Sequence, residues 1–334
     1  MNTPLNSTTG AIKSIARHLA VIYFLVATGG VFAAFPDKAI TIVAPYPPGG
    51  SSDIVARLLS PMLAEKLRQP MVIENAAGAG GSIGALRVVR AQPDGYTLLL
   101  GSGSEVLVNK LVTSSVSYEG IRDLVPVVMI GTGPMVILGK SQLPASNMSE
   151  VLALARAKPG QLNYASAGEG TIMHLAGELT KMRAKVDIVH VPYRGSPPAL
   201  NDLMGGQVDM AISTLSAAQA AIQTGKVKVL AVTSSKPSEL AKNVPPLGMV
   251  AGLEGFDISV WFGLFVPAKT PQSIIKSIEQ VALEILNDPT LKKRLAEQGV
   301  IAMGLSSDEF SKFLTVELEK YQTIVKAANI TTRP

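Results

Sequence analysis

The sequence predicts an α/β fold with two domains, each a mostly parallel sheet flanked by helices. Its 334 residues are enough for two domains that each bury a core. Short apolar runs rich in β-branched residues alternate with segments of helical periodicity, as in parallel strands joined by crossover helices. Three early strands, at residues 41–44, 71–74 and 96–100, each end in a small-residue loop before a helix. In an open parallel sheet such loops gather at one edge, where ligands bind.

The loop after the first strand carries the clearest binding chemistry. The run Thr41–Ala44 stops at a turn, residues 46–50, that ends in two prolines and two glycines. A helical pattern then starts at residues 51–53, which read Ser-Ser-Asp. Glycine lets a ligand approach the backbone, and the unpaired N–H groups at a helix start suit a carboxylate or another small anion. The alternative is a tight connection in which the serines and the aspartate only cap the helix.

The second half of the chain repeats this pattern. Asn147 and Glu150 form a predicted capping box at the start of a helix. A strand at residues 162–165 leads through a second small-residue loop, residues 166–171, into a helix that runs through Lys181. Further strands are predicted at residues 186–191, 208–212 and 227–232. A second helix start with free backbone N–H groups is therefore expected in this half.

The predicted domains are not both continuous in sequence. Residues 234–255 are weakly patterned, and they precede a strand at 258–266 that contains the only tryptophan, Trp261. Helices are expected in the remainder. We therefore predict one domain from residues 35–138 and 258–334, and another from 139–257. Two crossings of the chain, near Gly139 and Ile258, would form a two-stranded hinge, and Trp261 beside it is expected to change its exposure on closure unless it is a core residue.

The first 34 residues have the pattern of a secretory signal peptide. Lys13 and Arg17 precede an apolar run, Leu19–Val31, and Val31 with Ala33 marks a cleavage site after Ala33. The run is shorter than the roughly 20 residues of a membrane-spanning helix, so an uncleaved anchor is the alternative and not the expectation. The exported product is expected to be periplasmic and soluble.

Composition excludes several classes of function. Without residues 1–34, which hold two of the 30 basic residues and no acidic one, the net charge is only +3, too low and too scattered for a nucleic-acid-binding protein. Cysteine is absent, which excludes disulfides, thiolate metal sites and a lipid-modified cysteine. No cluster of His, Asp and Glu has metal-ligand spacing, so neither a metal nor a cofactor is expected.

Many ordered motifs resemble the signature of the Bug family, the substrate-binding proteins of tripartite tricarboxylate transporters. The resemblance covers the whole mature chain and includes the motifs Tyr46–Gly50 with Asp53, Pro93–Leu98, His190–Tyr193, Gly205–Val208 and Pro267–Pro271. Two features depart from the family pattern: Ala76-Ala77 stands where Arg-Pro is usual, and Pro61 lies inside the first helix.

The resemblance implies a two-lobed, periplasmic binding protein-like fold of type II that closes on a small organic acid and delivers it to the membrane permease subunits of a transporter. A monomer is expected, with no catalytic residue. Members of the family hold a carboxylate between two loops, one from each lobe, largely through backbone N–H groups and ordered water. We add the loop after the strand at residues 96–100, which is residues 101–104. The expected ligand-binding residues are then Tyr46, Pro47, Gly49, Gly50, Ser51, Ser52, Asp53, Ser102, Ser104, Ser166, Gly168, Gly170, Thr171, Tyr193, Gly195, Pro198, Ala199 and Ser213.

Two other classes of function remain as alternatives. One is a periplasmic ligand sensor that signals to a membrane histidine kinase. The other is a serine hydrolase, because Gly80–Gly84 fits G-x-S-x-G around Ser82, with His174 or His190 as the base. A nucleophile elbow needs a strand directly before the serine, whereas a loop is predicted here, so a helix N-cap is the favoured interpretation. The ligand's identity, and any contact from His174 or Arg194, stay open.

Overall fold

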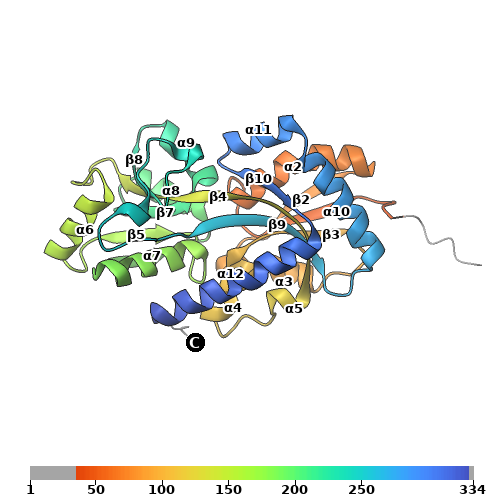
Figure 1. Ribbon diagram of the computed structural model, residues 1–334, viewed down its shortest axis with the longest axis horizontal. Coiled ribbons are helices and arrows are strands. Elements are labelled where there is room, and N and C mark those ends of the chain that lie inside the picture. Colours follow the sequence, from red (N-terminus) through yellow and green to blue (C-terminus); the bar gives the residue numbers. More distant parts are fainter. Residues whose placement is uncertain (1–34, 331–334) are drawn as a thin grey trace, which may run out of the picture. The chain divides into compact units, whose positions relative to one another are not determined.

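The structure is a computed structural model that describes residues 35–330, so the predicted signal peptide at residues 1–34 lies outside the described residues. Residues 38–330 form an α/β unit around a curled, mixed sheet (Figure 1). Its strands divide into two sets that share the long strand β4 (Leu124–Lys140). The two-lobed α/β fold class is therefore confirmed.

The first set of strands is parallel at one edge and antiparallel at its centre. Its order is β2-β1-β3-β9-β4, with β10 also paired to β4. Strands β2, β1 and β3 run parallel, whereas β9 and β10 pair antiparallel with their neighbours. The bounds are β1 (Ile40–Ala44), β2 (Met71–Asn75), β3 (Thr97–Ser102), β9 (Ser259–Pro267) and β10 (Ile301–Leu305).

Helices cover both faces of this first set. Leu98 and Leu99 are adjacent in β3 and both fully buried, and successive side chains of a strand point to opposite faces. The covering helices are α2 (Ser51–Leu67), α3 (Ser82–Val89), α10 (Gln272–Leu286), α11 (Pro289–Glu297) and α12 (Ser307–Ala327). A π-helical turn η2 (Ser104–Val108) and the short helices α4 (Asn109–Val112) and α5 (Gly120–Asp123) follow β3.

The second set of strands pairs with the other half of β4. Strands β6 (Val189–Pro192), β5 (Asn163–Ser166) and β7 (Met210–Thr214) are parallel, and β7 and β8 (Val227–Val232) pair antiparallel with β4. Its helices are α6 (Met148–Ala157), α7 (Ile172–Ala184), α8 (Ser196–Met204) and α9 (Leu215–Gln223). As predicted, Asn147 caps α6, and its side chain accepts a hydrogen bond from the backbone N of Glu150 at 3.0 Å.

The chain crosses between the two sets twice. In β4, Pro134 pairs with Ser259 of the first set, and the next residue, Met135, pairs with Thr214 of the second. The return passes through Thr233, whose backbone N donates to the Met135 carbonyl and whose carbonyl accepts from Ile258 N. These two crossings are the two-stranded hinge. The domain boundaries at residues 138–139 and 257–258 remain a prediction.

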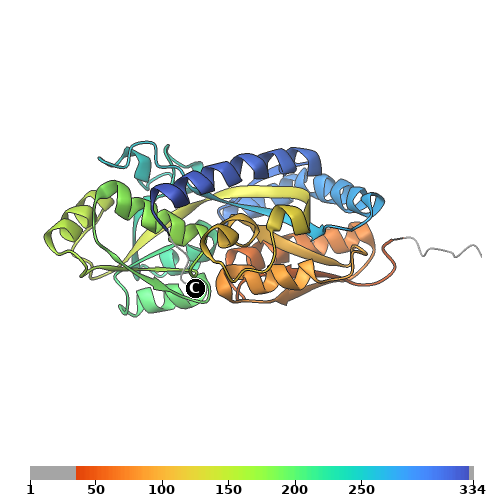
Figure 2. The same cartoon turned by 90° about the horizontal axis from the view of Figure 1, so that it is seen from below.

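Trp261 is a core residue of the first lobe. It lies on β9 with 1% of its surface exposed, and its ring packs edge-on against Phe310 and Phe313 of α12. Figure 2 shows α12 running alongside β4. This burial matches the core alternative and not the expected change of exposure at the cleft.

Candidate functional site

The loop between β1 and α2 is held in place by Asp53. This buried carboxylate accepts hydrogen bonds from Gly49 N at 3.0 Å, from Arg57 Nε at 3.0 Å and from Asn75 Nδ2 at 3.1 Å. Although burial opposes ionisation, the hydrogen bonds from Arg57 and Gly49 hold the pKa of Asp53 below its ordinary value. Asp53 therefore fixes the shape of the loop, and its oxygens are already occupied within the first lobe.

Behind this loop lies a buried network around Glu105, a residue that the sequence analysis missed, which bonds to Tyr46 and Ser102, two predicted ligand contacts. The hydroxyl of Tyr46 lies 3.0 Å from the Gly80 carbonyl and 3.1 Å from Oε2 of Glu105. Ser102 donates to the same carboxyl group from its backbone N and from Oγ, the latter at 2.9 Å. Burial raises the pKa of Glu105 to about 7. Ser102 and Glu105 have capping-box spacing, and this sequence signal could have revealed Glu105.

The loop between β5 and α7 belongs to the second lobe and lies against Gly80 and Ser104 of the first lobe. Thr171 caps α7: its Oγ1 accepts from His174 N at 3.2 Å and donates to the Gly168 carbonyl at 2.8 Å. Ser166 Oγ accepts from Gly168 N at 3.1 Å and lies 2.7 Å from His190 Nε2. Both side chains are completely buried. Their hydroxyls shape this loop and are used within it.

The loops of the two lobes meet directly. Ile172 N at the start of α7 donates to Ser104 Oγ of the first lobe at 3.1 Å. A Cβ added at Gly80 would lie 2.6 Å from the Glu169 carbonyl oxygen, and one added at Gly195 would lie 2.5 Å from Cδ of Pro47. Both glycines also have positive φ, so the approach needs glycine at these positions.

Two buried hydroxyls beside these loops have no hydrogen-bond partner in the described part of the chain. They are Ser52 Oγ in the first turn of α2 and Ser213 Oγ near the end of β7, each in a residue with 1% of its surface exposed. Ser213 lies two residues before α9, and α9 contacts α2. Burying a hydroxyl without a partner costs about 1–3 kcal/mol, so such groups in opposing lobes indicate a missing ligand or water.

The remaining predicted residues divide between cleft and core. Gly50 is the N-cap of α2, and Ser51 follows it, buried. Gly170 is packed against the Asn109 side chain of the first lobe. The Tyr193 hydroxyl donates to Asp202 at 2.6 Å within its own lobe, and Ala199 is part of the core cluster of the second lobe. Pro198 is partly buried in the first turn of α8, whereas its neighbour Pro197, which was not predicted, packs near Gly49.

A polar cavity of about 570 Å³ opens beside the contact between α2 and α9. Its lining comes from both lobes and consists of Gly49, Ile54, Ser216, Ala217, Gln219, Ala220, Gln223, Glu297 and Gln298. Arg194, the one basic residue of the loops that meet here, is exposed. The lining therefore offers amide, hydroxyl and backbone groups together with the Glu297 carboxylate, and none of its residues is a cation.

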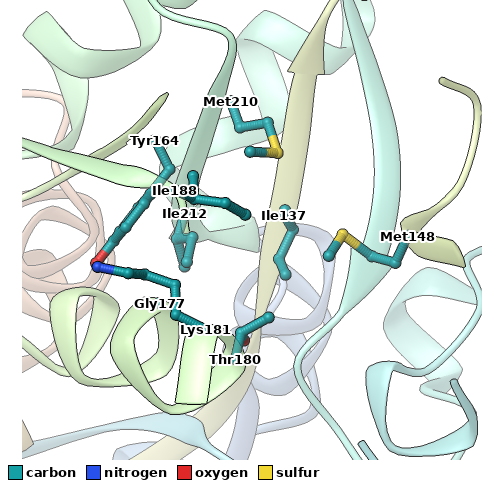
Figure 3. Close-up of a pocket in the computed structure, with 9 residues that line it drawn as sticks. All are labelled: Ile137, Met148, Tyr164, Gly177, Thr180, Lys181, Ile188, Met210 and Ile212. Atoms are coloured by element: carbon teal, nitrogen blue, oxygen red, sulfur yellow. The ribbon is translucent and has the colours of Figure 1, made fainter. Parts of the chain in front are cut away.

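Another cavity lies inside the second lobe (Figure 3). It is lined by Ile137, Met148, Tyr164, Gly177, Thr180, Lys181, Ile188, Met210 and Ile212. At about 20 Å³ it has room for about one water molecule. It is too small for an organic acid.

The structure does not form the nucleophile elbow of a hydrolase. Ser82 Oγ donates to the Ala79 carbonyl at 2.8 Å, and Ser82 follows the 3₁₀ turn η1 (Ala79–Gly81) and not a strand. His174 and His190 stack on each other with ring centroids 4.3 Å apart, beside Ser166 and not Ser82. Burial lowers the pKa of both histidines, to about 3 for His190, so neither is charged at neutral pH.

Residues 35–330 contain neither a metal-ligand cluster nor a candidate membrane-spanning helix. No three His, Asp or Glu side chains in this range converge as metal ligands would. Within the same range, no helix combines the length and the apolar character that crossing a membrane requires.

Comparison with known proteins gives the family. Residues 55–330 match the model of the tripartite tricarboxylate transporter family receptor, TctC. Protein BugT of Bordetella pertussis is 34% identical over 319 residues, which cover 94% of this chain and 98% of BugT. A protein of R. palustris solved with adipate has a TM-score of 0.86 and 30% identity, and covers 90% of this chain and 100% of its own.

The protein MatC from Rhodopseudomonas palustris, solved with bound malate, has a TM-score of 0.82 and 31% identity over 87% of this chain and all of its own. Both similar structures were thus solved with a small dicarboxylic acid. With the family model covering most of the chain, this protein belongs to the TctC, or Bug, family of periplasmic solute-binding receptors.

Proposed function

We propose that this protein captures a small organic acid between its two lobes, in the periplasm, and delivers it to the membrane subunits of a tripartite tricarboxylate-type transporter. The observation that carries the proposal is the pair of buried, unpartnered hydroxyls, Ser52 and Ser213, on opposing lobes. The adipate and malate of the two similar structures support a carboxylate as the ligand class.

The chemistry of the cleft supports an anion held by neutral donors. The start of α2 offers backbone N–H groups at the positive end of a helix dipole, next to the Ser52 hydroxyl. A buried carboxylate needs such donors because its transfer from water is otherwise costly. Arg57, the nearest cation on α2, is paired with Asp53 at 2.9 Å. Bridging water would complete the set of hydrogen bonds.

Capture requires contact with both lobes. A ligand favours the closed state only if it binds that state better than the open one. Ser52 belongs to the first lobe and Ser213 to the second, so one ligand bonded to both would supply this difference. The proposed contact residues are therefore Gly50, Ser51, Ser52 and Ser213. Asp53, Thr171, Tyr193 and Ala199 hold the loops in place.

The ligand can be found with a thermal-shift screen of the mature protein, residues 34–334, against organic acids that include adipate and malate. A ligand at about 100 times its Kd adds about 2.7 kcal/mol of stability. In a chain of this length that raises the Tm by roughly 5 °C. The methyl ester of a binding acid should give no shift. An ester that binds as well as its acid would contradict an anion site.

The contact itself is tested by Ser52→Ala and Ser213→Ala, with affinity measured by calorimetry. Each lost hydrogen bond to a charged group should cost about 1.5–3 kcal/mol, or roughly 10- to 150-fold in Kd. Ser82→Ala is the matched control, because its hydroxyl bonds to Ala79 outside the contact. Unchanged affinity in both variants would refute the site. Delivery is tested separately by co-purification with the permease subunits, and export by the mass of the mature N-terminus.

A further inference from the structure

Glu105 is a buried carboxyl group beside the candidate cleft that the proposed ligand contacts leave unexplained. It is 1% exposed, and its two oxygens meet three donor groups: the backbone N and the Oγ of Ser102, and the hydroxyl of Tyr46. A carboxylate that only capped its own helical turn would need the bonds from Ser102 alone. The bond to Tyr46 joins Glu105 to the loop at the start of α2.

Glu105 also belongs to a segment that contacts the second lobe. Its neighbour Ser104 accepts the hydrogen bond from Ile172 N, and Asn109, about one turn later, donates to the Gly80 carbonyl at 2.9 Å. A Cβ on Gly81 would lie 3.1 Å from Oε2 of Glu105. The carboxyl group therefore lies directly behind the backbone where the two lobes meet.

Among residues 38–330, no lysine or arginine forms an ion pair with Glu105. The elements packed against η2 carry these titratable groups that are bonded elsewhere or buried. Lys110 of α4 is bonded to the Val116 carbonyl, Arg122 of α5 is paired with Asp123, and Arg87 of α3 is paired with Glu74. Glu317 and Lys320 of α12 are paired with each other, Tyr321 of α12 is buried, and the Tyr118 hydroxyl donates to the Glu105 carbonyl. The other charged residues of α12, which are Asp308, Glu309, Lys312, Glu319 and Lys326, are exposed to solvent. Strand β3 and η1 contribute none.

Both protonation states of Glu105 can be satisfied by the same neighbours. The ionised form accepts from Tyr46 and Ser102, as the hydrogen bonds describe. When protonated, the carboxyl group can donate to Ser102 Oγ at 2.9 Å, because a hydroxyl both donates and accepts. Burial places the pKa of Glu105 at about 7, so a second negative charge entering the cleft would favour the protonated form.

We propose that Glu105 is a positioning residue that links ligand capture to proton uptake: as the cleft closes on a carboxylate, one proton binds to Glu105. This inference rests on the proposed function. Its consequence above pH 7 is a preference for low ligand charge, because binding must then either protonate Glu105 or place each additional carboxylate near an ionised Glu105 whose charge no facing cation offsets.

The test is calorimetric titration of the full mature protein at pH 6–9, in two buffers of different ionisation enthalpy. The probes are adipate, malate and the acid with the largest thermal shift. The affinity should be constant below pH 7 and should fall above it, by up to tenfold per pH unit when one proton is taken up. Glu105→Gln should bind with an affinity independent of pH. Glu279→Gln is the matched control: Glu279 is a buried glutamate that accepts Ser307 N away from the cleft, and this variant should keep the wild-type slope.

The outcomes separate the two proposals. Binding without proton uptake and without a pH slope overturns the linkage and leaves carboxylate capture intact, as does an unchanged slope in Glu105→Gln. Failure of every acid to bind at every pH rejects the proposed function, and this inference with it. If Glu105→Gln does not fold, the linkage between binding and proton uptake is still tested by the wild-type titrations, together with ¹³C NMR of glutamate-labelled ligand-free protein. A spectrum with no glutamate carboxyl that titrates above pH 6 overturns the proposal.

Discussion

The loop before α2 and the loop before α7, one in each lobe, look alike in sequence but use their side chains differently. In the loop before α2, the Asp53 carboxylate holds the backbone, and the Ser52 hydroxyl is left without a partner. In the loop before α7, the Thr171 and Ser166 hydroxyls themselves hold the backbone. A loop fastened by a carboxylate keeps its hydroxyls for a ligand, whereas a loop fastened by hydroxyls does not. The side chains that select the ligand should therefore be mainly those of the first loop and Ser213.

The largest expected effect comes from placing a charge in the first loop. Gly50→Asp puts a carboxylate at the N-cap of α2, where the ligand's carboxylate is expected to approach the backbone. The affinity should fall by roughly 100-fold or more, because like charges repel and the α2 N–H groups gain a competing cap. Gly50→Ala is the control, since its Cβ makes the same close contact with the Pro47 carbonyl without the charge. Calorimetry that finds equal affinity in both variants would show that the carboxylate binds elsewhere.

The next largest effect is expected when the fastening of the first loop is removed. Asp53→Ala leaves Gly49 N without its acceptor and removes one of the two acceptors of Asn75 Nδ2, which keeps the Tyr46 carbonyl, so the free energy of unfolding should fall by about 2–3 kcal/mol and the affinity should fall with it. The stability from ionised Asp53 is present above its ordinary pKa of 3.8 and is lost as the pH falls through its lower folded pKa. Urea denaturation at pH 7 and pH 3 measures the loss of stability and its dependence on pH, and calorimetry measures the affinity.

The control for this variant is Arg57→Ala. The Arg57 side chain is 56% exposed, so its ion pair with Asp53 should contribute less than about 1 kcal/mol. If Arg57→Ala destabilises the protein as much as Asp53→Ala, the ion pair and not the hydrogen bond to Gly49 holds the loop.

The smallest effect is expected in the second loop. Thr171→Val keeps the side-chain shape and removes the cap of α7, which should lower the free energy of unfolding by about 1 kcal/mol and change the affinity little. Ser52→Ala should show the opposite pattern, with weaker binding and unchanged or slightly higher stability. A large loss of affinity in Thr171→Val, measured by calorimetry at a temperature where the variant is folded, would remove the proposed difference between the loops.

The sequence predicted the strand, loop and helix units well because those patterns are local. The turn at residues 46–50 and the cap at Asn147 both depend on neighbours in the chain. Glu105 has capping-box spacing from Ser102, a local signal, but its contact with the first loop could not be predicted in this way. It looks like a single polar residue in an apolar helical run, and only the fold brings Tyr46, 59 positions away, to its carboxyl group. The burial of Ala199 and Trp261 also depends on packing between distant elements.

The continuous strand β4 determines what kind of movement can open the protein. Because one strand belongs to both sheets, the lobes cannot separate by unfolding a loop between them, and the strand itself must twist. The change of partner falls at Pro134, whose ring fixes φ, so the twist must be taken up by ψ of Pro134 and by its neighbours in β4. The second crossing, at Thr233 and Ile258, adds a parallel constraint. Opening should therefore be a rotation about an axis near β4, with little change inside either sheet.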